Sequence, residues 1–130
     1  LWVAMKVYSS NVLYTIGVPP SSQARLTCAQ KDELMRSLLP YSPRIDGMVN
    51  EAKIISSLNR YPLENITAPT LLISTADDPY NTYDAAKYTA ENIPGAKFIG
   101  FEIGGHFLIG QEEKVRSEVS QFLKQHAIAE

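Results

Sequence analysis

Two short apolar runs, each followed by polar residues, constrain the fold of this chain more than any other feature. Residues 70–74 lead into Asp77 and Asp78, and residues 97–103 lead into a Gly-Gly-His turn that ends at His106. The first run is nearly continuous, which is typical of a strand buried on both faces of a parallel sheet, and the second run predicts another strand. The carboxyl ends of such strands meet at the edge where open α/β sheets bind their ligands. The two runs therefore predict carboxylates and an imidazole at one edge of a parallel sheet.

A helical pattern follows each predicted strand. Asn81 or Thr82 is the predicted cap of a helix that ends at a Pro-Gly pair, residues 94–95. Residues 112–126 give a last helix, and its predicted inner side consists of Val115, Val119, Phe122 and Leu123. The order strand, helix, strand, helix is that of a parallel crossover, so the two strands should be adjacent. The fold class predicted for this part of the chain is α/β.

The first sixty residues show helical patterns and no strand. Residues 1–16 give one helix, and Thr27 with Gln30 matches a capping box that opens a second helix, which stops before Pro40. A third helix has its apolar residues at spacings of three, four and seven, which predicts one buried face: Ile45, Met48, Val49, Ala52 and Ile55.

A segment with two prolines and no helical period, residues 61–69, separates the two parts of the chain. We therefore expect two regions. Residues 1–60 form a helical cap or lid, and residues 61–130 form a strand–helix–strand–helix portion at the edge of a larger sheet. Two strands and two helices cannot cover both faces of such a sheet, so a large apolar surface should need further polypeptide or an oligomer partner.

Composition and charge exclude several classes of function. The 130 residues, 45% hydrophobic and 20% charged, fit one globular domain, and a net charge of −2 leaves no basic surface for nucleic acid. The single cysteine, Cys28, excludes an internal disulfide, provides no metal-binding motif and indicates a reducing, cytoplasmic setting. The apolar opening, residues 1–8, is shorter than the roughly 18 to 20 residues of a membrane span. We expect no nucleic acid, membrane, metal or cofactor partner.

Asp78 and His106 have the separation of an acid and base pair. They lie 28 positions apart, which leaves room for one helix and one returning strand. In a nucleophile–histidine–aspartate triad, the carboxylate orients the imidazole and stabilises the imidazolium that forms when the ring takes the nucleophile's proton. The glycines before His106 allow a sharp turn, because glycine accepts positive φ at no steric cost. The sequence predicts contact between these two side chains.

Several segments resemble the C-terminal part of the α/β-hydrolase superfamily: Pro69-Thr70-Leu71-Leu72-Ile73, Asp77-Asp78-Pro79, Ile93-Pro94-Gly95-Ala96-Lys97 and Gly104-Gly105-His106. The resemblance covers residues 62–126 and departs at Thr75, where the family pattern has glycine. It implies that Asp78 is the triad acid and His106 the general base, in the order nucleophile, acid, histidine. It also implies a cofactor-independent, esterase-like hydrolase of small, partly hydrophobic substrates, with residues 1–60 as the cap.

The nucleophile of such a triad is missing from the sequence. The chain contains no G-x-S-x-G elbow and no HGGG-type oxyanion motif. Ser74 lies within a predicted strand, and Cys28 has no elbow around it. We therefore expect the chain to be the C-terminal part of a longer enzyme and inactive by itself. Its partner is either the missing N-terminal half of the fold or, in a homo-oligomer, a second copy.

Three alternatives remain open from the residues. The Asp-Asp-Pro segment can be a turn in which an aspartate caps backbone N–H groups, with Asp77 as a helper that bonds the loop and the assignment of the acid open to a shift by one residue. The protein can also be a non-catalytic α/β-hydrolase-like binding or signalling module. A phosphoacceptor signalling domain is disfavoured, because only one further strand follows Asp78.

Overall fold

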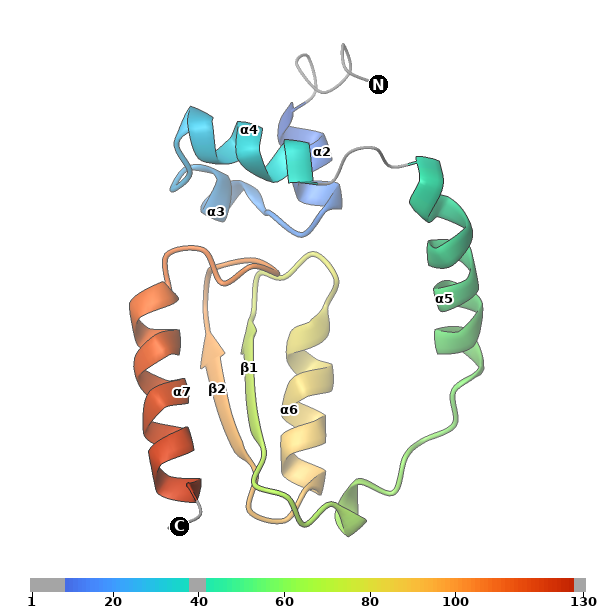
Figure 1. Cartoon of the computed structure of the whole chain (residues 1–130), viewed down its shortest axis with the longest axis vertical. Helices are drawn as coiled ribbons and strands as arrows, with labels where there is room; N and C mark the ends of the chain where they lie inside the picture. The colour runs from blue at the N-terminus through green and yellow to red at the C-terminus, as the bar shows by residue number, and fades with distance from the viewer. Residues whose placement is uncertain (1–8, 38–41, 128–130) are drawn as a thin grey trace. The chain divides into compact units, whose positions relative to one another are not determined.

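The computed structural model describes residues 9–37 and 42–127. Residues 1–8, the start of the first predicted helix, lie outside the described residues, and so do residues 38–41, where the second predicted helix ends. The elements follow one another as α2 (Ser9–Thr15), α3 (Pro20–Gln23), α4 (Cys28–Ser37), η1 (Ser42–Arg44), α5 (Ile45–Ser57), η2 (Leu63–Asn65), β1 (Leu71–Thr75), α6 (Thr82–Asn92), β2 (Lys97–Phe101) and α7 (Glu112–His126) (Figure 1). The chain is a mixed α/β protein, consistent with a partial α/β-hydrolase-like fold.

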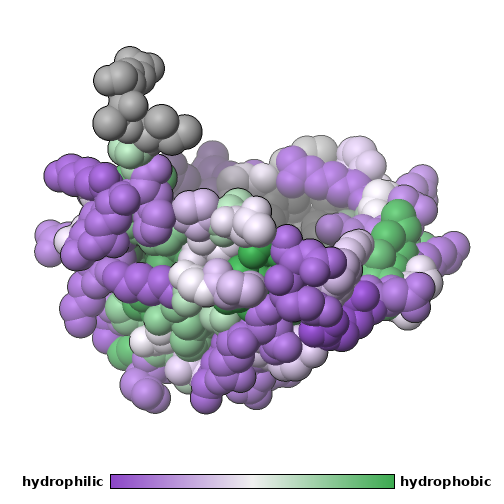
Figure 2. All heavy atoms as spheres, turned by 90° about the horizontal axis from the view of Figure 1, so that it is seen from below, coloured by the Kyte–Doolittle hydropathy of each residue, from purple (hydrophilic) through white to green (hydrophobic). Residues whose placement is uncertain are grey.

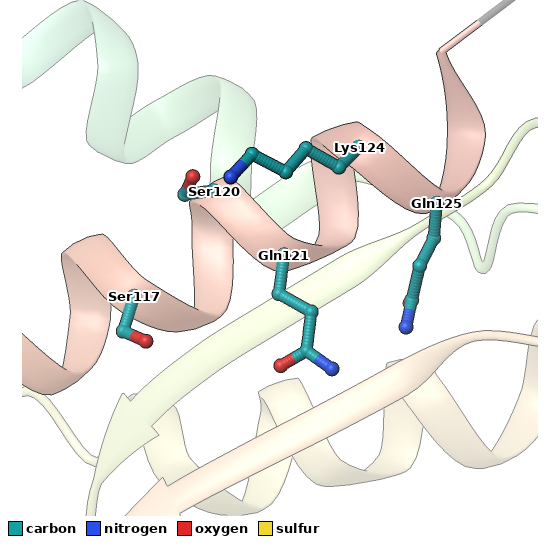
Figure 3. A pocket seen from close by; sticks show the side chains of 5 residues that line it. All are labelled: Ser117, Ser120, Gln121, Lys124 and Gln125. Atoms are coloured by element: carbon teal, nitrogen blue, oxygen red, sulfur yellow. The ribbon is translucent and has the colours of Figure 1, made fainter.

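The two strands form one parallel sheet, as the sequence predicts. Leu71 lies opposite Lys97, and the register continues to Thr75 opposite Phe101. Helices α6 and α7 lie on opposite sides of these strands (Figures 1 and 3). Because the strands are parallel and in register, the loops that follow them leave the sheet at the same end, the carboxyl end of both strands.

Packing divides the chain into two compact units. Of the described residues, one unit joins 9–26 with 63–127, and the other lies between Thr27 and Pro62. The segment with α2 and α3 therefore belongs to the unit that contains the sheet. The predicted regions, a cap up to residue 60 and a core portion after it, describe functional roles and stay a prediction.

The interior of the sheet-containing unit is small. Its buried apolar side chains are Leu13, Val18, Ile93 and Ile109. In β1 only Ser74 and Thr75 are buried, whereas residues 71–73 are half-buried. The prediction of a strand buried on both faces is therefore wrong for most of β1. The physical reason is that, among the described residues, β1 has a single neighbouring strand and one helix on each face of the sheet. A central strand of a parallel sheet has a strand on both sides and is buried more completely.

Two predicted inner faces are also partly or wholly exposed. In α7, Val119 and Leu123 are 36% and 61% exposed, while Val115 and Phe122 are half-buried. The apolar residues of α5 are exposed along the whole helix, so its predicted buried face is wrong. Figure 2 shows apolar side chains at the surface among polar ones. Helical period located both helices correctly, but it cannot show whether another element covers them.

The starts of two helices show which capping predictions hold. At α4 the capping box is confirmed, because Gln30 N donates to Thr27 Oγ1 at 3.2 Å and Thr27 N donates to Gln30 Oε1 at 2.9 Å. At α6, Asn81 occupies the position before the helix with φ of 53°, but its side chain makes no capping hydrogen bond. The hydroxyl of Thr82 bonds to Asp78 instead. Among residues 9–37 and 42–127, no helix has both the length and the apolar character to cross a membrane.

Candidate functional site

Asp78 and His106 are in contact at the carboxyl-end edge of the sheet. Asp78 follows β1, His106 follows β2, and His106 Nδ1 lies 2.9 Å from Asp78 Oδ2. Asp78 is buried with 5% of its surface exposed, whereas the His106 side chain is 43% exposed. The structure thus brings together the two residues that the sequence singles out, and their catalytic role stays a prediction.

Three hydrogen bonds hold the carboxylate of Asp78. Oδ1 accepts Tyr80 N at 2.9 Å, and Oδ2 accepts both the Thr82 hydroxyl and His106 Nδ1. Burial raises the pKa of Asp78, but the bonds from Thr82, His106 and the Tyr80 amide outweigh it and leave the pKa below its usual value. An ionised carboxylate only accepts hydrogen bonds, so Nδ1 carries the proton. In the neutral ring, Nε2 is then the nitrogen that can accept a proton.

Asp77 has a separate set of partners. Its Oδ1 accepts Gly104 N at 2.9 Å and Gly105 N at 2.8 Å, and its Oδ2 accepts the Ser21 hydroxyl at 2.6 Å. Burial raises the pKa of Asp77, but the hydrogen bonds lower it by more and leave it below its usual value. Asp77 therefore bonds to the backbone of the turn before His106, as expected of a helper in the loop.

The turn before His106 needs both of its glycines. Gly104 has φ of 152° and Gly105 has φ of 60°, and a Cβ on Gly105 would lie 2.6 Å from Gly17 O. Thr75, at the position where the resembling family has glycine, donates its hydroxyl to Gly105 O at 2.9 Å. This departure from the family pattern therefore gives the turn a further anchor on β1.

The segment before α3 also supports the histidine, which the sequence analysis missed. His106 N donates to Gly17 O at 2.8 Å, and the Tyr80 hydroxyl donates to Thr15 O at 2.9 Å. Gly17 has φ of 96°, and a Cβ there would lie 2.5 Å from the Cβ of His106. The only sequence signal was Gly17 followed closely by two prolines, which marks a turn but not what the turn contacts.

Aromatic side chains flank the imidazole. The ring of Tyr80 meets that of His106 edge-on at 4.8 Å, and the Phe107 ring lies 5.8 Å from it and is 45% exposed. Leu108, the third residue expected beside the pair, is half-buried with φ of 57°. These contacts give the histidine an apolar border on two sides.

Neither Asp78 nor His106 lines the pocket that is described for this chain. The pocket shown in Figure 3 lies along α7 and is lined by Ser117, Ser120, Gln121, Lys124 and Gln125, all from that one helix. Within residues 9–37 and 42–127, no group of three or more His, Cys, Asp or Glu side chains is placed to hold a metal ion. Cys28 is exposed at the start of α4, and Ser74 is buried against Thr82.

Comparison with protein families gives a match to a family of hydrolases. A family model described as serine hydrolase matches residues 10–125, which is most of the chain. Comparison with curated proteins and with solved structures gave no significant match.

Proposed function

The chain belongs to the serine hydrolase family, and from this premise we propose that it supplies the acid and the base of a nucleophile–histidine–aspartate triad. In this proposal the chain is the C-terminal part of an α/β-hydrolase, with Asp78 as the orienting acid and His106 as the general base. The observation that carries the proposal is the 2.9 Å contact between His106 Nδ1 and the buried, ionised Asp78.

In this proposal His106 and Asp78 have different roles in the reaction. Nε2 of His106 accepts the proton of the attacking hydroxyl, and the imidazolium that forms is stabilised by the negative charge on Asp78. The imidazolium then returns the proton to the leaving group, and a water molecule completes hydrolysis of the acyl-enzyme by the same route. Proton transfer of this kind contributes about 10² to 10⁴ in rate. No cofactor takes part in these steps.

The nucleophile comes from polypeptide other than these 130 residues. Membership of a serine hydrolase family supports a serine, and no serine of this chain stands in a G-x-S-x-G elbow. The chain alone is therefore inactive. The exposed apolar side chains of α5 support a cap that excludes water from a small, partly hydrophobic ester. The free thiol of Cys28 supports a cytoplasmic setting.

The sheet supports a partner for this chain. Within the described residues β1 pairs with β2 alone, and a two-stranded sheet is marginally stable by itself. We assign the partner surface to the missing N-terminal half of the fold, whose strands would extend the sheet. In a homo-oligomer, a second copy would take its place.

Activity-based labelling of the full-length gene product tests the proposal. A fluorophosphonate probe should label one serine, and peptide mapping should place that serine outside residues 1–130. His106→Gln should lower both labelling and hydrolysis of a p-nitrophenyl ester at least about a hundredfold. His126→Gln is the matched control, because His126 Nδ1 contacts only Phe122 O of its own helix among its described partners, and it should leave both rates unchanged.

Two results would reject the proposal. Labelling of a serine within residues 1–130 would reject the external nucleophile. Ligand binding without labelling or turnover would favour a non-catalytic α/β-hydrolase-like binding or signalling module.

A further inference from the structure

Thr82 donates its hydroxyl hydrogen to the oxygen of Asp78 that also accepts from His106. Both bonds end on Oδ2, and the third, from Tyr80 N, ends on Oδ1. The sequence pattern predicts Thr82 only as a possible cap at the start of α6. Its position makes it the one hydroxyl that the structure places directly on the acid of the pair among the described residues.

Ser74 extends the chain of hydrogen bonds from Thr82 into the sheet. The two hydroxyl oxygens lie 3.2 Å apart, and geometry alone leaves the donor open. Because Thr82 has one hydroxyl hydrogen and the carboxylate can only accept, that hydrogen goes to Asp78, and Ser74 is the donor to Thr82. Ser74 is 6% exposed on β1, so its hydroxyl is held in place by the strand.

These contacts tie the acid to two rigid elements. Asp78 stands in the loop between β1 and α6, Ser74 belongs to the strand, and Thr82 is the first residue of the helix. A carboxylate oxygen offers about two lone pairs. When Thr82 takes one of them, the carboxylate can no longer rotate freely, and the other lone pair is directed to His106 Nδ1.

We propose that Thr82 is a positioning residue that fixes Oδ2 of Asp78 for His106, with Ser74 as its anchor. The effect on turnover rests on the proposed function, whereas the effect on the imidazole does not. A side chain that only starts the helix would change stability and leave the ring unaffected. A side chain that orients the acid must also change how firmly the Nδ1 hydrogen is held.

The test is proton and nitrogen NMR of His106 in the full-length protein, alongside kinetics. The wild type should show a protected low-field Nδ1–H signal, assigned by its loss in His106→Gln. Thr82→Val should raise the rate of Nδ1–H exchange with water at least about tenfold and lower kcat by roughly ten- to a hundredfold with KM nearly unchanged. Thr82→Ser keeps the hydroxyl and should restore both.

Thr89→Val is the matched control, because Thr89 is on the same helix and donates to Ala85 O. It should leave the signal and kcat unchanged. Ser74→Ala provides a second route if Thr82→Val does not fold, and it should raise exchange in the same direction by a smaller factor.

Unchanged Nδ1–H exchange in a folded Thr82→Val or Ser74→Ala protein overturns the proposal, whatever happens to the melting temperature. Faster exchange in Thr82→Val with rescue by Thr82→Ser supports it. If the wild type has the protected signal but no hydrolase activity, the proposed function fails while the positioning role of Thr82 is still decided by exchange.

Discussion

Two adjacent aspartates at the end of β1 have different tasks. Asp78 bonds to the imidazole of His106, while Asp77 bonds to the amides of Gly104 and Gly105 and to Ser21. The sequence predicted the Asp78–His106 contact, because the spacing and the parallel strands fix where both loops begin. It did not predict the hydrogen bonds of Ser21 to Asp77 and of Thr82 to Asp78, since single hydroxyl residues have no spacing pattern that identifies their partners.

Asn substitutions should separate the two aspartates. In the full-length enzyme, Asp78→Asn should lower kcat on the order of 10⁴ with little change in fold, because asparagine favours the wrong tautomer and cannot balance the imidazolium. Asp77→Asn should reduce activity far less and lower stability by about 0.5 to 2 kcal/mol. Turnover of an ester and thermal melting of both variants measure this. Equal, small losses of activity would reject Asp78 as the acid, and the reverse order would transfer that role to Asp77.

The same carboxylates predict how stability depends on pH. Both have a folded-state pKa below the ordinary 3.8, despite burial that raises it, because hydrogen bonds favour the ionised form. Their contribution is therefore fully present above about pH 4 and is lost as the pH falls through the lower folded-state pKa values. Urea unfolding between pH 6 and about pH 2.5 should show the free energy of unfolding falling below pH 4. Asp77→Asn should make that fall shallower, and an unchanged slope would contradict the assignment.

The bounds of helices and turns were easier to predict than the contacts between them. Helical period placed α7 at the bounds that the structure has, because charged and apolar residues alternate on it with a regular spacing. The turn before His106 was predicted from its glycines, but not the close approach of Gly17 and Pro19 to it. That approach depends on how the segment around α2 and α3 packs against the loops that follow β1 and β2, which the sequence of either segment does not encode locally.

Two alanine substitutions should isolate that close approach. Gly95 and Gly105 both have positive φ, 75° and 60°, so alanine costs each about 1 to 2 kcal/mol of backbone strain. A Cβ on Gly95 would meet nothing within 4 Å, whereas one on Gly105 would meet Pro19 Cδ and Gly17 O. Gly105→Ala should therefore lose a further 1 to 3 kcal/mol or so from overpacking. Equilibrium urea unfolding measures both, and equal losses would contradict the tight contact.

At the scale of the whole molecule, the sequence predicted the fold class and the parallel pairing of the strands but overestimated burial. Residues 71–73 of β1, and Val119 and Leu123 of α7, read as core positions and are half-buried or exposed. The pattern of apolar residues shows which side chains favour burial, but it does not show which element packs against them. The apolar surface that is left exposed is the physical basis for the proposed partner.

That exposed apolar surface predicts how the 130-residue chain behaves alone. As a 14.4 kDa monomer it would leave Val119, Leu123 and Tyr88 in water, together with one edge of β1 that is unpaired among the described residues, so we expect it to self-associate. Light scattering coupled to size exclusion should give a mass above that of the monomer. Leu123→Lys should shift the population toward monomer, whereas Ser120→Lys, which adds the same charge at an exposed polar position of the same helix, should shift it less. A cooperatively unfolding monomer would contradict this prediction, because it would mean that two strands and their helices bury enough surface to be stable without a partner.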